Sequence, residues 1–150
     1  MKSFKFVFVS FILLIGIISG CKKDDVSTAP PATGTVNEVE PNDQTAQALG
    51  ALGTTDITVV GSASTANDVD KYTITLGATT NLHADITWAG GGDLAVGITD
   101  QNGNLVAFRN TGVSPRGCTL PRVAGTYSIY INANGTTGFP QAYSLKIGPR

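Results

Sequence analysis

Apolar and polar residues alternate in short runs along most of this chain. The apolar positions recur at every second residue, which is the period of a strand with one buried face. The runs are Ile57 and Val59; Tyr72, Ile74 and Leu76; Leu82, Ala84, Ile86 and Trp88; Leu94, Val96 and Ile98; Tyr127, Ile129 and Ile131; and Tyr143, Leu145 and Ile147. This pattern predicts half-buried strands whose listed residues, including Trp88 and Tyr127, face a common core.

Turn signals separate these runs. They are Gly77, the Gly90-Gly91-Gly92 run, Asn102-Gly103, Ala124-Gly125 and Asn134-Gly135. Asn-Gly between two alternating runs is a strong hairpin signal. Regularly spaced strands with turns between them favour two packed antiparallel sheets. We therefore expect an all-β fold, a jelly-roll-like antiparallel β-sandwich of about eight strands, with at most one helical turn at residues 45–49.

The N-terminus has the pattern of an export signal. Lys2 and Lys5 precede an apolar stretch at residues 6–18, which ends at Ser19-Gly20-Cys21. The stretch is shorter than the roughly 20 apolar residues of a membrane-spanning helix. Residues 1–20 are therefore predicted to be a signal peptide. The segment IISGC resembles a bacterial lipobox, which implies that Cys21 carries lipid such as palmitate; the alternative is a plain secretory signal.

A polar segment follows this signal. Residues 21–36 are rich in Ser, Thr, Ala, Pro and Gly, a composition typical of a flexible tether. Lys22-Lys23-Asp24-Asp25 resembles the signal that sends lipoproteins of Bacteroidota-type bacteria to the outer face of the outer membrane. That resemblance implies a lipid-anchored bacterial outer-membrane protein facing the cell exterior. The alternative interpretation is a solvated charge run.

Charge and size narrow the possible functions. Without residues 1–20, the chain keeps 8 basic and 11 acidic residues. Its four arginines are scattered from Arg109 to Arg150, and no segment interleaves basic and aromatic residues. Nucleic acid is therefore not expected as a partner. Residues 37–150 are long enough for one small domain.

Two acidic segments suggest a metal site. The only glutamates of the chain, Glu38 and Glu40, lie two residues apart, so on an extended strand they point to the same side. Asn42 continues this series, and Asp68 and Asp70 come from a second segment. Clustered oxygen ligands suit Ca²⁺, which takes 6 to 8 of them. The weaker candidates are Asp43 and Asn67. The alternative is a metal-free turn, because Asn and Asp side chains readily bond to their own backbone in turns.

Several motifs in order resemble one known family, the bacterial pre-peptidase C-terminal domain. They are EVEPND at 38–43, NDVDKYTITL at 67–76, GDLAVGITDQNGNLVA at 92–107, AGTYSIYINANG at 124–135 and AYSLKI at 142–147. The resemblance covers residues 37–148 and implies a jelly-roll-like β-sandwich of the kind appended to exported enzymes. Related collagen-binding domains bind Ca²⁺ through the corresponding segments. By that resemblance the ligands are Glu38, Glu40 and Asn42 from an N-terminal arm, with Asp68 and Asp70 from the loop entering the next strand.

No catalytic constellation is expected. The one pair that could suggest nucleophilic chemistry is Cys118 with His83. Alternation places His83, Asp85 and Thr87 toward solvent, whereas Cys118 shares its parity with the apolar Leu120. The two side chains are therefore predicted to lie on different faces, and the protein is predicted not to be an enzyme.

One aromatic residue breaks the inward pattern. Tyr130 has the opposite parity to Tyr127, Ile129 and Ile131, so it is expected to be exposed and to mark a possible ligand surface. The leading interpretation is a non-catalytic, lipid-anchored surface module that binds or targets a protein or glycan ligand, stabilised by Ca²⁺. The alternative is a structural or accessory subunit of a secreted or surface enzyme carried on another chain.

Overall fold

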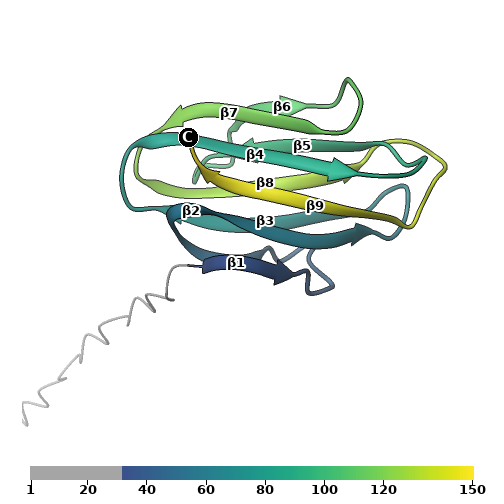
Figure 1. Ribbon diagram of the computed structural model, residues 1–150, viewed down its shortest axis with the longest axis horizontal. Helices are drawn as coiled ribbons and strands as arrows, with labels where there is room; N and C mark the ends of the chain where they lie inside the picture. The colour runs from purple at the N-terminus through teal and green to yellow at the C-terminus, as the bar shows by residue number, and fades with distance from the viewer. Residues whose placement is uncertain (1–31) are drawn as a thin grey trace, which may run out of the picture.

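The computed structural model describes residues 32–150, which are built from strands (Figure 1). The nine strands are β1 (Ala32–Asn37), β2 (Gln47–Ala63), β3 (Val69–Leu76), β4 (Thr80–Trp88), β5 (Leu94–Thr99), β6 (Leu105–Arg109), β7 (Arg116–Arg122), β8 (Gly125–Ala133) and β9 (Gln141–Pro149). No helix in this range is long and apolar enough to cross a membrane. The predicted signal peptide and Cys21 lie outside the described residues.

One long strand joins two layers. The strand order is β6-β5-β8-β3-β2-β9-β4-β7, and β1 pairs with β2 outside this path. The first part of β2 pairs with β3, and its last part, Ile57 to Ala63, pairs with β9. In Figure 1, β2, β9, β4 and β7 lie in front of β3, β8, β5 and β6. The prediction of an all-β sandwich is confirmed.

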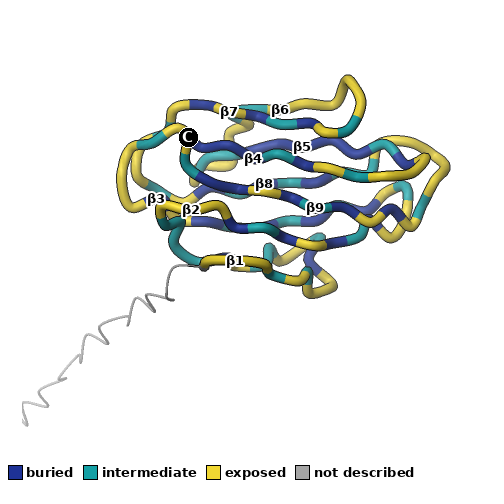
Figure 2. The backbone as a smooth tube through the Cα atoms, in the orientation of Figure 1, coloured by how far each residue is buried: buried dark blue, intermediate teal, exposed yellow. Residues whose placement is uncertain are grey.

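The core lies between these layers and follows the predicted alternation. Figure 2 shows buried and exposed positions alternating along the strands. The apolar residues of β3 and β8 and of β4 and β9 meet in one buried cluster. Trp88 differs from the prediction, because it lies at the end of β4 and is only partly buried against this cluster. Burying one Val, Leu or Ile side chain of this cluster contributes about 1.5–3 kcal/mol to folding. The cluster is therefore the main source of stability for the sandwich.

Three further features differ from the sequence-based expectations. Residues 32–36, expected in the flexible tether, belong to β1, whose backbone pairs with β2. The helical turn expected at residues 45–49 is absent, because the extended β2 begins at Gln47. The pairings β1 with β2 and β2 with β3 are parallel, and the other pairings are antiparallel.

The hairpin predicted at Asn102-Gly103 connects β5 to β6. Gly103 has a φ of 78°, a conformation that glycine adopts at little cost. The Asp100 carboxylate accepts hydrogen bonds from the Asn102 and Asn104 backbone N–H groups, both at 2.9 Å. Hydrogen bonds from Asn104 lower the pKa of Asp100. Asp100 thus stabilises its own turn.

Candidate functional site

The segment after β1 carries most of the predicted site residues. We call residues 38–46, between β1 and β2, the N-terminal arm. The Glu38 N–H donates to the Val60 carbonyl oxygen at 2.9 Å, which continues the pairing of β1 with β2. The Glu38 side chain then turns inward and accepts a hydrogen bond from the Ser62 N–H at 2.8 Å. These bonds hold the arm over the end of β2, next to the start of β3.

Two groups of carboxylates meet here. One oxygen each from Glu38, Glu40 and Asp70 lie within 4.8 Å of one another, and the same holds for Asp43, Asp68 and Asp70. Asp70 is fully buried and shared by both groups. We call these five residues together with Asn42 the arm cluster. Asp68 and Asp70 share a parity on an extended segment, which is why both side chains point toward the arm.

Asn42 lies inside this cluster and is 1% exposed. Its side-chain amide donates to Glu38 Oε1 at 3.0 Å, and its backbone N–H donates to Glu40 Oε2 at 2.8 Å. Among the described residues, Asn42 Oδ1 and Asp70 Oδ1 are buried without a hydrogen-bond partner. Both are acceptors, and a buried acceptor without a donor costs about 1–3 kcal/mol. The cluster therefore has unused oxygen atoms that only a donor or a cation can satisfy.

Two buried tyrosines support the cluster from the core side. The Tyr72 hydroxyl donates to Glu38 Oε1 at 2.6 Å, and the Tyr143 hydroxyl donates to Asp70 Oδ2 at 2.7 Å. The two hydroxyl oxygens lie 2.6 Å apart. The Tyr143 hydroxyl also lies 3.0 Å from Glu38 Oε1. The two hydroxyls therefore join Glu38 and Asp70 in one buried hydrogen-bond network.

The surroundings disfavour a charge on Asp70. Burial raises the pKa of Asp70 to about 8, and the nearby charges of Glu38 and Asp68 act in the same direction. Burial also raises the pKa of Glu40. Burial raises the pKa of both Tyr72 and Tyr143, so these tyrosines stay neutral donors. Without a cation, the cluster thus retains a proton that an ion would displace.

A glycine makes room for this arrangement. Gly61 lies on β2 opposite Tyr143 of β9. A Cβ at Gly61 would lie 2.6 Å from the Tyr143 hydroxyl and 2.9 Å from Glu38 Oε2. Both distances are too short for real contacts, so the approach of Tyr143 and Glu38 depends on glycine at this position.

The structure thus brings together most of the residues suggested by the sequence. Asn67 is an exception, because it is exposed and its N–H donates to Thr65 Oγ1. Tyr130 lies apart, on the outer face of β8, and is half-buried where full exposure was expected. Tyr72 and Tyr143 were not predicted to belong to the site. Tyr72 lies two residues after Asp70 on β3, so the two side chains point to the same face, and this spacing was a signal for Tyr72.

A second acidic cluster surrounds His83 of β4, on the outer face of the layer that contains β2, β9, β4 and β7. The expectation that His83 faces solvent was wrong, because it is 4% exposed. His83 Nε2 lies 3.0 Å from Asp56 Oδ1, and Nδ1 lies 3.0 Å from Asp85 Oδ2, so the two carboxylates cover the ring. The Arg150 guanidinium pairs with Asp85 at 2.5 Å. We call these four residues the His83 cluster.

Cys118 lies on the opposite side of the sheet from His83. It pairs in register with Ala84, belongs to the buried core and is a free thiol. Burial raises the pKa of Cys118, which suppresses the reactive thiolate. The prediction that the two residues lie on different faces is confirmed.

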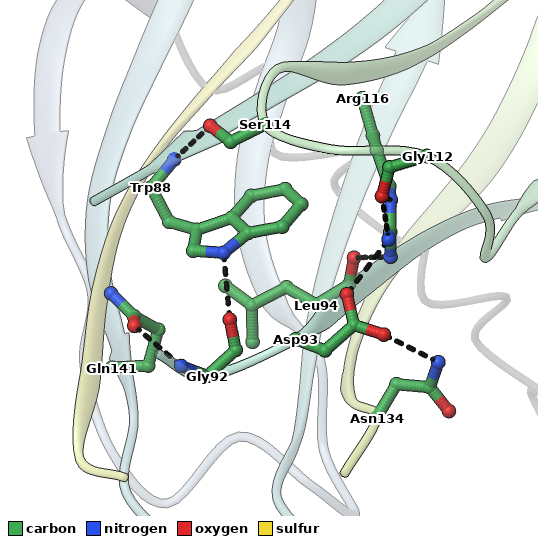
Figure 3. Close-up of polar contacts among 9 residues, drawn as sticks. All are labelled: Trp88, Gly92, Asp93, Leu94, Gly112, Ser114, Arg116, Asn134 and Gln141. Atoms are coloured by element: carbon green, nitrogen blue, oxygen red, sulfur yellow. Dashed lines mark hydrogen bonds and ion pairs between the residues drawn. The ribbon is translucent and has the colours of Figure 1, made fainter. Parts of the chain in front are cut away.

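A further group of polar residues surrounds Trp88 at the end of β4 (Figure 3). The Trp88 indole N–H donates to the Gly92 carbonyl oxygen at 2.7 Å, and the Arg116 guanidinium lies over the ring at 5.1 Å. Asp93 pairs with Arg116 at 2.7 Å and accepts from the Asn134 amide at 3.0 Å. These groups satisfy one another and fix the loops, so Asp93 holds Arg116 and Asn134 and does not cap the glycine turn.

Comparison with known proteins supports the fold. No protein-family model matches the chain, and no curated protein matches it. The structure is similar to the pre-peptidase C-terminal domain of collagenase from Bacillus anthracis, with a TM-score of 0.58, 17% identity, and coverage of 73% of this chain and 99% of that one. The resemblance expected from the sequence is therefore confirmed at the level of the fold.

A second solved structure is more distant. PliG of Aeromonas hydrophila, a periplasmic inhibitor of g-type lysozyme, matches with a TM-score of 0.45 and 17% identity. The match covers 78% of this chain and 96% of PliG.

Proposed function

We propose that this protein is a non-catalytic binding module whose N-terminal arm is fixed by Ca²⁺. One observation carries the proposal: the carboxylates of the arm cluster converge without a cationic side chain. None of the ion pairs between described residues involves Glu38, Glu40, Asp43, Asp68 or Asp70. Packing like charges together is unfavourable unless protons or an external cation neutralise them.

The donor set favours calcium among the common cations. All side chains of the arm cluster offer oxygen, the ligand atom that Ca²⁺ and Mg²⁺ prefer. Glu38, Glu40, Asn42, Asp68 and Asp70 would hold the ion, with Asp43 as a further ligand. Ca²⁺ takes 6 to 8 oxygens in flexible geometry, whereas Mg²⁺ demands a near-ideal octahedron and keeps several waters. The many converging side chains therefore fit calcium better, and the unpaired Asn42 Oδ1 and Asp70 Oδ1 would gain a partner.

The ion would supply a cross-link rather than chemistry. Its ligands come from the arm and from the start of β3, so binding would tie these segments together. By mass action, a ligand that binds only the folded state stabilises it by about 2.7 kcal/mol at 100 times its dissociation constant.

A binding role is favoured over catalysis by the positions of the reactive groups. His83 is held between two carboxylates, and Cys118 is buried on the other side of the same sheet. In the described residues 32–150, the Cys118 thiol therefore has no histidine beside it to act as a base, and both ring nitrogens of His83 are already held by carboxylates.

We further propose that the module is anchored at the bacterial surface by lipid on Cys21. The support is the sequence IISGC after an apolar stretch. Growth of cells with labelled palmitate should label the parent protein and leave a Cys21→Ser variant unlabelled. Equal labelling of both would refute the anchor.

The metal is tested by thermal unfolding of residues 22–150 in EDTA and in millimolar CaCl₂. We expect calcium to raise the midpoint of the parent and to leave a Glu40→Ala, Asp70→Ala double variant unchanged. Asp100→Asn is the matched control, because Asp100 is an acid used only by its own hairpin turn. Identical midpoints for the parent with and without calcium would show that the arm cluster is a metal-free turn.

A further inference from the structure

A row of residues crosses the outer face of the layer that contains β6, β5, β8 and β3. Gly97 of β5 pairs with Phe108 of β6 on one side and with Tyr130 of β8 on the other. Tyr130 pairs in turn with Lys71 of β3. The neighbours of Gly97 in sequence, Val96 and Ile98, are fully buried, so alternation places this row away from the core. Two aromatic rings thus flank a position that has no side chain.

This row forms the floor and walls of a slot of about 330 Å³, lined also by Thr99, Leu105 and Asn132. A Cβ at Gly97 would lie 3.3 Å from the Phe108 ring and 3.6 Å from Leu105 Cδ1, so glycine keeps the floor open. Phe108 and Leu105 are 46% and 61% exposed. Adjacent strands lie about 4.8 Å apart, so the strands that carry the two rings are about 9.6 Å apart.

Polar groups lie beside these apolar walls. Thr99 offers a hydroxyl, and Asn132 offers a side-chain amide. Lys71 Nζ lies over the Tyr130 ring, 5.8 Å from its centroid. Because Lys71 is on β3, it approaches Tyr130 from the side away from Gly97. The slot thus combines aromatic walls, neutral polar groups and one positive charge at its border.

We propose that this slot binds the pyranose ring of a uronic acid residue in a glycan. The C–H faces of a pyranose are apolar and fit between Phe108 and Tyr130, while its rim carries hydroxyls that can bond to Thr99 and to the Asn132 amide. The carboxylate of a uronic acid complements the charge of Lys71. Small-ligand sites commonly combine apolar walls with a few placed polar groups in this way. The inference deepens the proposed binding role by naming a ligand class.

The test uses the full chain from residue 22 at pH 7 with millimolar CaCl₂. Tetragalacturonate and a hyaluronan hexasaccharide are the acidic probes, and cellotetraose is the neutral comparison. Calorimetry should show binding of an acidic probe, with perturbed amide signals of Gly97 and Asn132 in NMR spectra. Phe108→Ala and Tyr130→Ala should each weaken binding at least about tenfold, since each removes one wall of the slot. Lys71→Gln should weaken it several-fold, and Lys71→Arg should restore it.

Val113→Ala is the matched control, because Val113 is 83% exposed and does not line the slot. The slot variants should keep the calcium-dependent rise in the thermal midpoint, which shows that they fold. Failure of both acidic probes to bind, equal binding of cellotetraose, or unchanged binding by the Phe108 and Tyr130 variants would each overturn the inference. A concentration-dependent dimer abolished by Phe108→Ala would assign the face to a second copy instead and would also overturn it.

The two proposals can fail separately. A calcium response without probe binding removes the uronic acid site and leaves the metal proposal standing. Probe binding that is the same in EDTA, with no calcium response, retains the slot and removes the metal.

Discussion

The arm cluster and the His83 cluster are both groups of acids drawn from distant parts of the chain, but they are neutralised differently. In the His83 cluster, Asp56 and Asp85 each contact a ring nitrogen of His83, and the Arg150 guanidinium adds a positive charge beside Asp85. In the arm cluster, the partners of the carboxylates are hydroxyls, amides and backbone N–H groups.

The difference shows that the acids of one cluster are paired with side chains of the same chain, whereas the acids of the other cluster have no cationic side chain as a partner. Both ring nitrogens of His83 lie 3.0 Å from carboxylate oxygens, and the Arg150 guanidinium lies beside Asp85. The chain itself therefore supplies the partners of these two acids. The arm cluster must take a proton or a metal ion from solution.

The largest expected effect comes from removing the His83 ring. His83→Gln takes away the common partner of Asp56 and Asp85 and should destabilise the protein by about 3 kcal/mol, the value for two hydrogen bonds to charged groups at the low end of their range. The thermal midpoint should fall by the same amount in EDTA and in calcium. A loss seen only in one of these conditions would show that the two clusters are coupled, and the comparison would fail.

A neutral side chain in the arm cluster is expected to raise the thermal midpoint of the calcium-free protein. Asp70→Asn keeps an acceptor for the Tyr143 hydroxyl but removes a buried acid. We expect it to abolish most of the calcium-induced stabilisation, about 2.7 kcal/mol at 100 times the dissociation constant, and to raise the midpoint in EDTA. Asp85→Asn is the paired variant and should lower the midpoint in both conditions. Destabilisation of the calcium-free protein by Asp70→Asn would contradict our account of the site.

The pH dependence should also separate the clusters. Because the pKa of Asp70 is raised from 3.8 to about 8, the folded state binds more protons than the unfolded state between these values. The contribution of Asp70 to stability is therefore present below pH 3.8 and is lost as pH rises through about 8. In EDTA, the midpoint of the parent relative to Asp70→Asn should fall from pH 5 to pH 9, roughly across this window.

Calcium must displace the Asp70 proton, so its stabilising effect should grow over the same pH range. Parallel curves for the parent and Asp70→Asn would show that Asp70 does not titrate there.

The smallest expected effect concerns the glycine beneath the His83 cluster. A Cβ at Gly148 would lie 1.8 Å from Asp56 Oδ1 and 2.8 Å from His83 Nε2. Gly148→Ala should therefore push Asp56 off the ring and cost about 1 kcal/mol, the net value of one hydrogen bond. Gly77→Ala is the control, because a Cβ there meets nothing within 4 Å. Equal unfolding curves for the two variants would show that the Asp56 contact contributes nothing.

Sequence alternation was sufficient to predict the strands because each half-buried strand repeats the same signal at every second residue. It also predicted the separation of Cys118 from His83. It could not predict the burial of His83, since Asp56 and Asp85 cover the ring from two strands. β1 was missed because ATGTVN has no apolar alternation and is held by backbone pairing with β2.

For the candidate site, the clustering of Glu38 and Glu40 was visible from spacing, and their proximity to Asp70 followed from the family resemblance. The contact of Tyr72 with Tyr143 was not predictable, because 71 residues separate them. Only the closing of β9 onto β2, opposite β3, brings the two hydroxyls together. The calcium ion itself stays a prediction.

The parallel pairing of β1 with β2 has a mechanical consequence. A pull on the chain at Ala32, directed away along β1, would load the backbone hydrogen bonds between β1 and β2 together, in shear. The arm cluster begins directly after the last of these bonds, where Glu38 contacts β2. A load that slides β1 along β2 would next reach Glu38 and its partners, so the hydrogen bonds of the arm cluster would resist opening of the domain from its N-terminal end.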